Sequence, residues 1–231
     1  MTAQPATTQR PSLMDSMAVD IPEGRKGNLC VERFDVTRDS LENMRLMFQP
    51  GNRSCRPGVY TRLLEEAPGQ DDVPEERRRG TLWMSDTTAE RRDHLEAAMA
   101  MRDHGGHVLI GGLGLGMIVR CALLATAVEH VEVLERNPDV VALVGPHYER
   151  MAEQLGKQVT IRTTDALTWE PPKGAFWSVV YFDIWPDLCD DNLPEMATLG
   201  RRFDCSRERV RQIEAALIGR IRARLREACR G

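Results

Sequence analysis

A glycine-rich turn and a later acidic residue, near the middle of the sequence, have the types and spacing needed to hold a nucleotide. Four glycines fill positions 111, 112, 114 and 116, directly after the apolar run Val108–Ile110. Glycine lets the backbone turn sharply and approach a ligand closely at the positive end of a helix. Glu135 follows Gly116 by 19 residues, a spacing that lets an acid accept hydrogen bonds from both ribose hydroxyls.

The elements that must position these residues alternate between strand and helix. Apolar runs predict strands at 108–110, 131–134, 159–162 and 177–182, with helices at 117–126 and 140–155. Pro138 lies near the first turn of the second helix, where its missing N–H costs nothing. Strands that alternate with helices form right-handed crossovers. We therefore predict an α/β fold with a Rossmann-like, mostly parallel sheet.

Two further acids end the third and fourth predicted strands. Asp165, followed by Ala166, ends the third strand, and Asp183 ends the fourth. Both fall on the carboxyl edge, where ligands bind in open α/β sheets. A strand-end carboxylate can also be a simple cap, but four strand ends that carry the expected residue in order favour a ligand role.

Val108–Asp183 resembles the cofactor-binding half of class I S-adenosylmethionine-dependent methyltransferases, and especially the branch that contains the spermidine-synthase-like proteins. The resemblance covers about a third of the chain. It implies a transferase, most simply a methyltransferase, that uses S-adenosylmethionine or its decarboxylated form. NAD is the competing ligand, but dehydrogenases of this fold usually place the glycine turn near the chain start, and here about 100 residues precede it.

The resemblance assigns a role to each matching position. The turn would border the amino-acid moiety of the cofactor, the acid after the second strand would hold the ribose, and the third strand end would meet the adenine edge. Asp183 would face the sulfonium and the acceptor and act as the catalytic residue. The implied cofactor-binding residues are Gly112, Gly114, Gly116, Glu135, Asp165, Ala166 and Asp183.

The upstream segment supports the same branch. Gly80–Asp86 is typical of a strand that enters a turn, and Thr88–Arg102 predicts an amphipathic helix that carries Asp93 and His94. The synthase-like proteins have a comparable strand and helix that line the acceptor pocket. Asp93 and His94 could act as acid and base, although an exposed helix face is the favoured interpretation. The segment Arg56–Arg62 predicts another loop and strand of this N-terminal cap.

Two departures from the polyamine synthases leave aminopropyl transfer only as an alternative. Those enzymes carry a base Asp three residues after the strand-four Asp, where this sequence has Pro186, and Asp187 comes one residue later. Leu113 and Leu115 stand in the glycine turn, where the synthases often hold an acid. The acceptor therefore stays open.

The C-terminal segment carries a second motif. Pro194 falls in the first turn of a helix capped by 190–192, and Ser206 caps a second helix that runs to Leu225. The sequence 199–215 closely resembles the last helix-turn-helix of primary bacterial sigma factors, whose second helix enters the major groove. The resemblance implies contact with DNA or RNA polymerase, with five residues toward DNA: Arg207, Glu208, Arg209, Arg211 and Gln212. The alternative is an Arg-rich amphipathic helix that closes the sheet domain or a homodimer interface.

Composition divides the chain in the same place. The 231 residues carry a net charge of −4, but residues 200–231 hold ten Arg against four acids, a balance of +6, which leaves −10 for the rest. We predict a flexible leader at 1–28, a small α+β cap at 29–103, the cofactor-binding domain at 104–190 and the basic tail at 191–231. A DNA-binding regulator whose nucleotide fold is vestigial or senses a metabolite is the second function hypothesis.

Several other classes are disfavoured. The apolar stretch Val108–Val128 could suggest a membrane span, but its glycines favour strand, turn and helix. Six scattered Cys with no Cys-x-x-Cys pair indicate reduced thiols in a cytoplasmic protein. His104 and His107 lack the partners of a metal site, so no metal is predicted.

Overall fold

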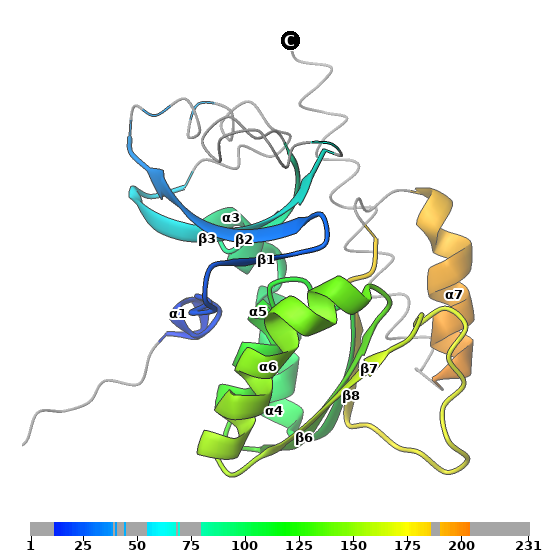
Figure 1. The fold of residues 1–231 in the computed structure, drawn as a ribbon. Helices are drawn as coiled ribbons and strands as arrows, with labels where there is room; N and C mark the ends of the chain where they lie inside the picture. Colours follow the sequence, from blue (N-terminus) through cyan, green and yellow to red (C-terminus); the bar gives the residue numbers. More distant parts are fainter. Residues whose placement is uncertain are drawn as a thin grey trace, which may run out of the picture.

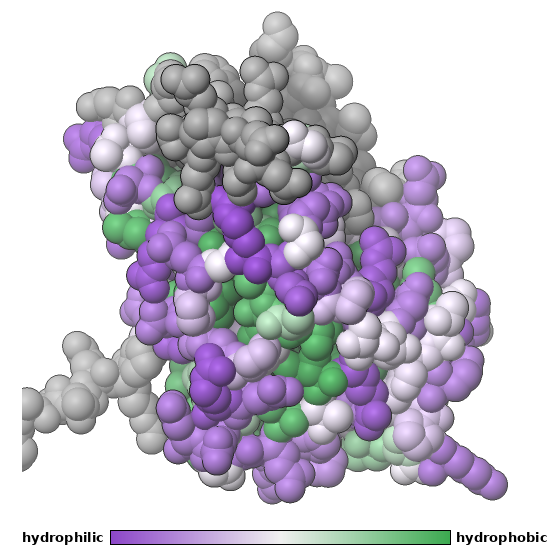
Figure 2. Space-filling model, in the orientation of Figure 1, coloured by the Kyte–Doolittle hydropathy of each residue, from purple (hydrophilic) through white to green (hydrophobic). Residues whose placement is uncertain are grey.

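The described part of the chain contains two four-stranded sheets, one antiparallel and one parallel (Figure 1). A computed structural model describes residues 12–38, 40, 44, 55–67, 69, 80–185 and 190–203. The antiparallel sheet lies over one end of the parallel sheet, and helices cover the parallel sheet. Hydrophilic residues dominate the described surface in Figure 2, with hydrophobic residues showing mainly in a band below the antiparallel sheet.

The antiparallel sheet has the strand order β1-β2-β3-β4. Its strands are β1 Gly24–Lys26, β2 Leu29–Val36, β3 Gly58–Glu66 and β4 Gly80–Ser85. The β1–β2 connection is a two-residue turn in which Gly27 takes a φ of 57°, a conformation that tight hairpins require. The strands predicted within 56–62 and 80–86 are thus present as β3 and β4.

The parallel sheet has the order β7-β6-β5-β8, and every neighbouring pair is parallel. The strands are β5 Gly106–Gly111, β6 Val128–Glu135, β7 Gln158–Thr163 and β8 Val179–Phe182. The Rossmann-like α/β prediction is confirmed by this topology. The order reverses between β5 and β8, and that switch point is where open α/β sheets form a ligand crevice.

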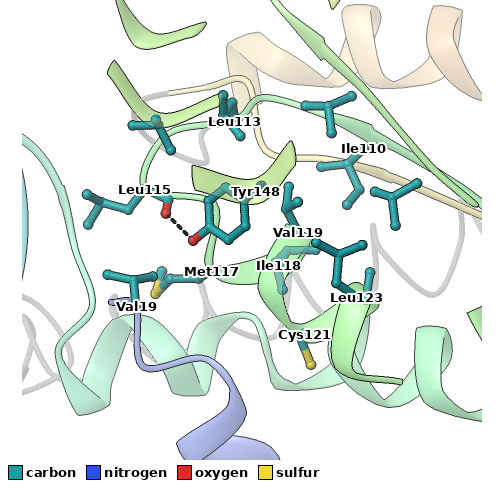
Figure 3. Close-up of a cluster of buried hydrophobic side chains, with 14 of the residues drawn as sticks. Val19, Ile110, Leu113, Leu115, Met117, Ile118, Val119, Cys121, Leu123 and Tyr148 are labelled. Carbon is teal, nitrogen blue, oxygen red and sulfur yellow. Dashed lines mark hydrogen bonds between the residues drawn. The ribbon is translucent and has the colours of Figure 1, made fainter. Parts of the chain in front are cut away.

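One face of the parallel sheet is covered by three helices, α4 Leu95–His104, α5 Met117–Leu124 and α6 Pro138–Gln154. Because successive strand residues alternate between faces, Val108 and Ile110 join the main core on this side, while Leu109 lies on the other. Tyr148 of α6 is fully buried in this core, and its hydroxyl donates to the carbonyl of Leu115 at 2.8 Å (Figure 3).

The opposite face is covered by a loop and a short helix. The loop 164–178 connects β7 to β8, and the helix is α7 Leu193–Arg202, which follows the 3₁₀ turn η2 Asp190–Asn192. Phe203 stacks on Trp169 with ring centroids 6.1 Å apart and lies 5.2 Å from the ring of Phe182. The helix predicted from Pro194 is therefore present and packs on the sheet domain. The second predicted helix, with Arg207, Glu208, Arg209, Arg211 and Gln212, lies outside the described residues, and its DNA contacts stay a prediction.

Two local expectations are corrected by the structure. Residues 12–28, expected as part of a flexible leader, include the helix α1 Leu13–Ser16 and the strand β1, because Met17 and Ile21 are buried in the main core. The single helix expected at 88–102 is divided into α3 Thr88–Asp93 and α4, with His94 at the junction.

No helix in the described ranges is long and apolar enough to cross a membrane. The stretch 108–128 divides instead into β5, the glycine turn, α5 and the start of β6.

Candidate functional site

The glycine turn between β5 and α5 is held tightly by the protein itself. Gly112 has a φ of 91°, and a Cβ there would lie 2.3 Å from the carbonyl oxygen of Asp183. Gly116 has a φ of 71°, and its Cβ would lie 2.0 Å from the Tyr148 ring. Glycine is therefore required at both positions by close packing as well as by backbone conformation.

Glu135, at the end of β6, ties this turn to the next helix. Its side chain is buried, Oε2 accepts from the backbone N–H of Leu113 at 2.8 Å, and Oε1 accepts from the backbone N–H of Asn137 at 2.8 Å. Each carboxylate oxygen can accept a second hydrogen bond. Glu135 thus holds the turn in place and keeps acceptor capacity for a ligand hydroxyl.

Asp165 follows β7 and shapes the next strand end. Its Oδ1 accepts from the backbone N–H of Leu167 at 2.8 Å, which closes a turn over Ala166. Ala166 is buried in the core on the loop-covered face. No described residue donates a hydrogen bond to the other carboxylate oxygen of Asp165, so that oxygen can accept from a ligand.

Asp183, directly after β8, lies close to His94, a residue that the sequence assigns to an exposed helix face. Its Oδ2 lies 3.6 Å from Nε2 of His94, and Nδ1 of His94 lies 2.8 Å from the hydroxyl of Tyr181. About a third of the Asp183 side chain is exposed, against 6% of the His94 side chain. The carboxylate therefore faces the surface and the imidazole supports it from inside.

The surroundings of Asp183 favour its protonated form. Burial raises the pKa of Asp183, the positive charge available on His94 lowers it, and the neighbouring Asp93 carboxylate raises it. The net effect is a raised pKa, so this carboxylate holds a proton more readily than an ordinary aspartate. A carboxyl group with a raised pKa beside an imidazole is an arrangement suited to proton transfer.

His94 corrects the expectation of an exposed helix face. The chain turns between α3 and α4 at this residue, which rotates the side chain inward, and only 5% of the residue is exposed. Asp93, its neighbour, stays exposed. Tyr181 was missed as a site residue, although the alternation along β8 puts it on the same face as Val179, which packs in the helix-covered core.

A small recess lies between the glycine turn and this pair. Its walls include Gly112, His94, Tyr181, Asp183 and Met84, and its volume is about 10 Å³, enough for roughly one water molecule. A ligand of nucleotide size therefore needs a side chain to move.

Met84 is the side chain that narrows the recess. It comes from β4 of the antiparallel sheet, and its sulfur accepts a hydrogen bond from the backbone N–H of Leu115 at 3.0 Å. A Cβ on Gly114 would lie 2.3 Å from the same sulfur. The thioether thus occupies the concave side of the turn. Methionine is flexible and can vacate such a position.

The three glycines, Glu135, Asp165 and Asp183 all lie along the carboxyl edge of the parallel strands, as their positions in the sequence imply. Within the described ranges, no group of three or more His, Cys, Asp or Glu side chains could hold a metal ion. The groups that form the candidate site are therefore the glycine turn, the three acidic side chains and the imidazole of His94.

Comparisons with known proteins add little beyond the fold. No protein-family model matches the sequence, and no curated protein matches it. Among solved structures, the chain is similar to the Δ1-pyrroline-2-carboxylate reductase of Thermococcus litoralis in complex with NADH and L-proline. The match covers 54% of this chain and 36% of that chain, at 15% identity and a TM-score of 0.31. The assignment of a Rossmann-like fold rests on the strand order and the switch point themselves.

Proposed function

We propose that this protein binds S-adenosylmethionine, or its decarboxylated form, at the carboxyl edge of the parallel sheet and transfers a group from it, most simply the methyl group. The observation that carries the proposal is the pairing of Asp183 with His94 beside the glycine turn, at the point where the strand order reverses between β5 and β8. Gly112 of the turn lines one recess together with His94 and Asp183.

The proposed role of each residue follows from its position along the carboxyl edge of the sheet. The turn of Gly112, Gly114 and Gly116 would border the amino-acid moiety, Glu135 would accept from the ribose hydroxyls, and Asp165 with Ala166 would meet the adenine. Glu135 and Asp165 each keep acceptor capacity for a ligand, whereas the turn becomes accessible only when Met84 moves. Glu135 is the central residue of this set, because it also fixes the turn through Leu113.

The cofactor, when bound, supplies an electrophilic methyl on a positively charged sulfur. The chain's own contribution is to orient an acceptor nucleophile toward that methyl, and positioning of this kind is worth roughly 7–11 kcal/mol. In its ionised form, Asp183 would accept a hydrogen bond or a proton from the acceptor nucleophile. His94, held by the Tyr181 hydroxyl, would keep the carboxylate oriented and share the proton.

Met84 sets a condition on binding. Because its sulfur takes the Leu115 N–H and fills the concave side of the turn, the thioether must swing away before the amino-acid moiety of the cofactor can enter. We therefore expect Met84→Ala to bind the cofactor more tightly than the unsubstituted chain.

Calorimetric titration tests the proposal directly. We expect S-adenosylhomocysteine to bind the full chain and NADH not to bind. Glu135→Gln should weaken that binding by about tenfold or more, since it removes a charged acceptor from the ribose and replaces one of the two oxygens that accept from the Leu113 and Asn137 N–H groups by an NH₂ donor. Glu129→Gln is the matched control, because Glu129 is an exposed residue near the start of the same strand. The affinity of this variant for S-adenosylhomocysteine should be unchanged.

The other outcomes are decisive as well. Binding of NADH alone would replace the transferase by a nicotinamide-dependent enzyme. Binding of neither ligand, to the full chain or to Met84→Ala, would overturn the proposal of a nucleotide cofactor.

A further inference from the structure

A second cleft lies away from the recess, between the outer side of α5 and the C-terminal half of α6. It has a volume of about 300 Å³, at the lower end of the range for small-molecule sites. Arg120 comes from α5, and His147, Arg150 and Gln154 come from α6, with Asp20 at the rim. The spacing of the α6 residues, at i, i+3 and i+7, puts them on one face of that helix. None of these residues lines the recess at the strand ends.

The cleft carries an excess of positive charge. Among the described residues, neither Arg120 nor Arg150 has a carboxylate within ion-pair distance, and the one carboxylate in the lining, Asp20, pairs with Arg33 at 2.9 Å. Burial lowers the pKa of His147, and Arg120 and Arg150 lower it further against a smaller opposing effect of Asp20. Two uncompensated guanidinium groups thus face the same imidazole.

Two nitrogens at this cleft are buried without a partner. Nε of Arg120 and Nε2 of His147 have no hydrogen bond to any described residue. Buried polar atoms are nearly always paired in folded proteins, and each exception calls for a missing partner. Of the three such nitrogens among the described residues, Nε of Arg91 lies outside this cleft, and the other two belong to side chains that line it, which points to a shared partner of opposite charge.

We propose that this cleft is a binding site for a small oxyanion, such as a phosphate or carboxylate group on a metabolite. A guanidinium group matches the geometry of two such oxygens with parallel N–H donors, and the cleft presents one from each helix. The Gln154 amide and the His147 ring add neutral donors. The ligand would bridge α5 and α6, the two helices that begin at the glycine turn and just after Glu135. It would occupy a site separate from the cofactor.

Inorganic phosphate is the probe that tests this site. We expect phosphate, titrated into the full chain at constant ionic strength, to shift the ring signals of His147 in the NMR spectrum and leave those of His94 unchanged. Arg150→Gln should weaken the phosphate affinity by about tenfold. Arg150 is exposed, so the substitution should leave the fold intact. Arg120→Gln, which removes the second guanidinium, should weaken it by a similar factor.

Arg201→Gln is the matched control, since Arg201 is an exposed arginine on α7, outside the cleft, and its phosphate affinity should equal that of the unsubstituted chain. A saturable His147 shift that both cleft variants lose would support the site. Absence of a saturable shift at millimolar phosphate, or a shift that survives both substitutions, would overturn it. Either result leaves the cofactor proposal untouched, because the two sites share no residue.

Discussion

Two strand ends of the parallel sheet carry acidic side chains in opposite circumstances. Glu135, after β6, is 8% exposed, and both of its oxygens accept from backbone N–H groups. Asp183, after β8, has 37% of its side chain exposed, and its Oδ2 lies 3.6 Å from Nε2 of His94. The same topological position thus serves in one case to fix the glycine turn and in the other to expose a titratable group at the surface.

The difference follows from what each strand leads into. β6 leads into α6, whose first free N–H groups need an acceptor, and Glu135 supplies one for Asn137 while it also holds Leu113. Among the described residues, β8 is followed by the non-helical segment 183–185, so the Asp183 carboxylate caps no helix there. The glycine turn belongs with Glu135 to the structural half of the site, because the Glu135 carboxylate holds the turn through Leu113.

The largest effect is expected in that structural half. Gly116→Ala combines a left-handed backbone, at about 1–2 kcal/mol, with a clash against the buried Tyr148 ring, at about 1–3 kcal/mol. We expect the free energy of unfolding to fall by about 2–5 kcal/mol in urea denaturation. Gly156→Ala is the control, because Gly156 has a φ of 65° and no atom lies within 4 Å of the place its added methyl would take. If both variants lose the same amount, the packing against Tyr148 is not what fixes the turn.

A smaller loss is expected for Glu135→Ala. The substitution leaves the N–H groups of Leu113 and Asn137 without their acceptor, at about 1–3 kcal/mol for the buried Leu113 donor and about 1 kcal/mol for the partly buried Asn137 donor, so we expect a destabilisation of about 2–4 kcal/mol by the same measurement. Asp183→Ala, the matched change at the other strand end, should cost much less, because no described backbone N–H donates to that carboxylate. Equal costs at the two positions would remove the distinction between them.

The smallest effect concerns the charge on Asp183. Because its pKa is raised in the folded protein, the protonated form is favoured by folding, and this contribution is lost as the pH rises through the folded pKa. Asp183→Asn, which is neutral throughout, should therefore raise the melting temperature slightly at neutral pH. The gain should shrink as the pH falls toward the ordinary aspartate pKa.

Asp103→Asn serves as the control for this pH series, because Asp103 is exposed and, among the described residues, forms an ion pair only with its neighbour Arg102 at 3.1 Å. Its melting temperature should change little across the same range. A gain for Asp183→Asn that grows toward acid pH would mean that the folded carboxylate is stabilised rather than strained, and would reverse the comparison with Glu135.

The order of strands and turns was predictable because local patterns determine it. The apolar runs that became β5, β6, β7 and β8, and the glycines between β5 and α5, follow from side-chain alternation and backbone freedom within a few residues. The positions of Glu135, Asp165 and Asp183 on one edge followed from parallel pairing alone. The chemistry of those acids did not follow, since it depends on partners far away in the sequence.

His94 and Met84 show why. His94 reaches Asp183 across 89 positions of the sequence because the chain bends between α3 and α4, and Met84 reaches the glycine turn because the antiparallel sheet lies over that end of the parallel sheet. The cleft of Arg120 and Arg150 likewise exists only where α5 and α6 lie side by side. The sequence by itself determined which elements form and which residues end the strands, because those depend on local sterics and hydrophobic periodicity. Tertiary packing decided which carboxylate accepts backbone hydrogen bonds and which is exposed beside an imidazole, because hydrogen-bond partners and burial are properties of neighbours in space.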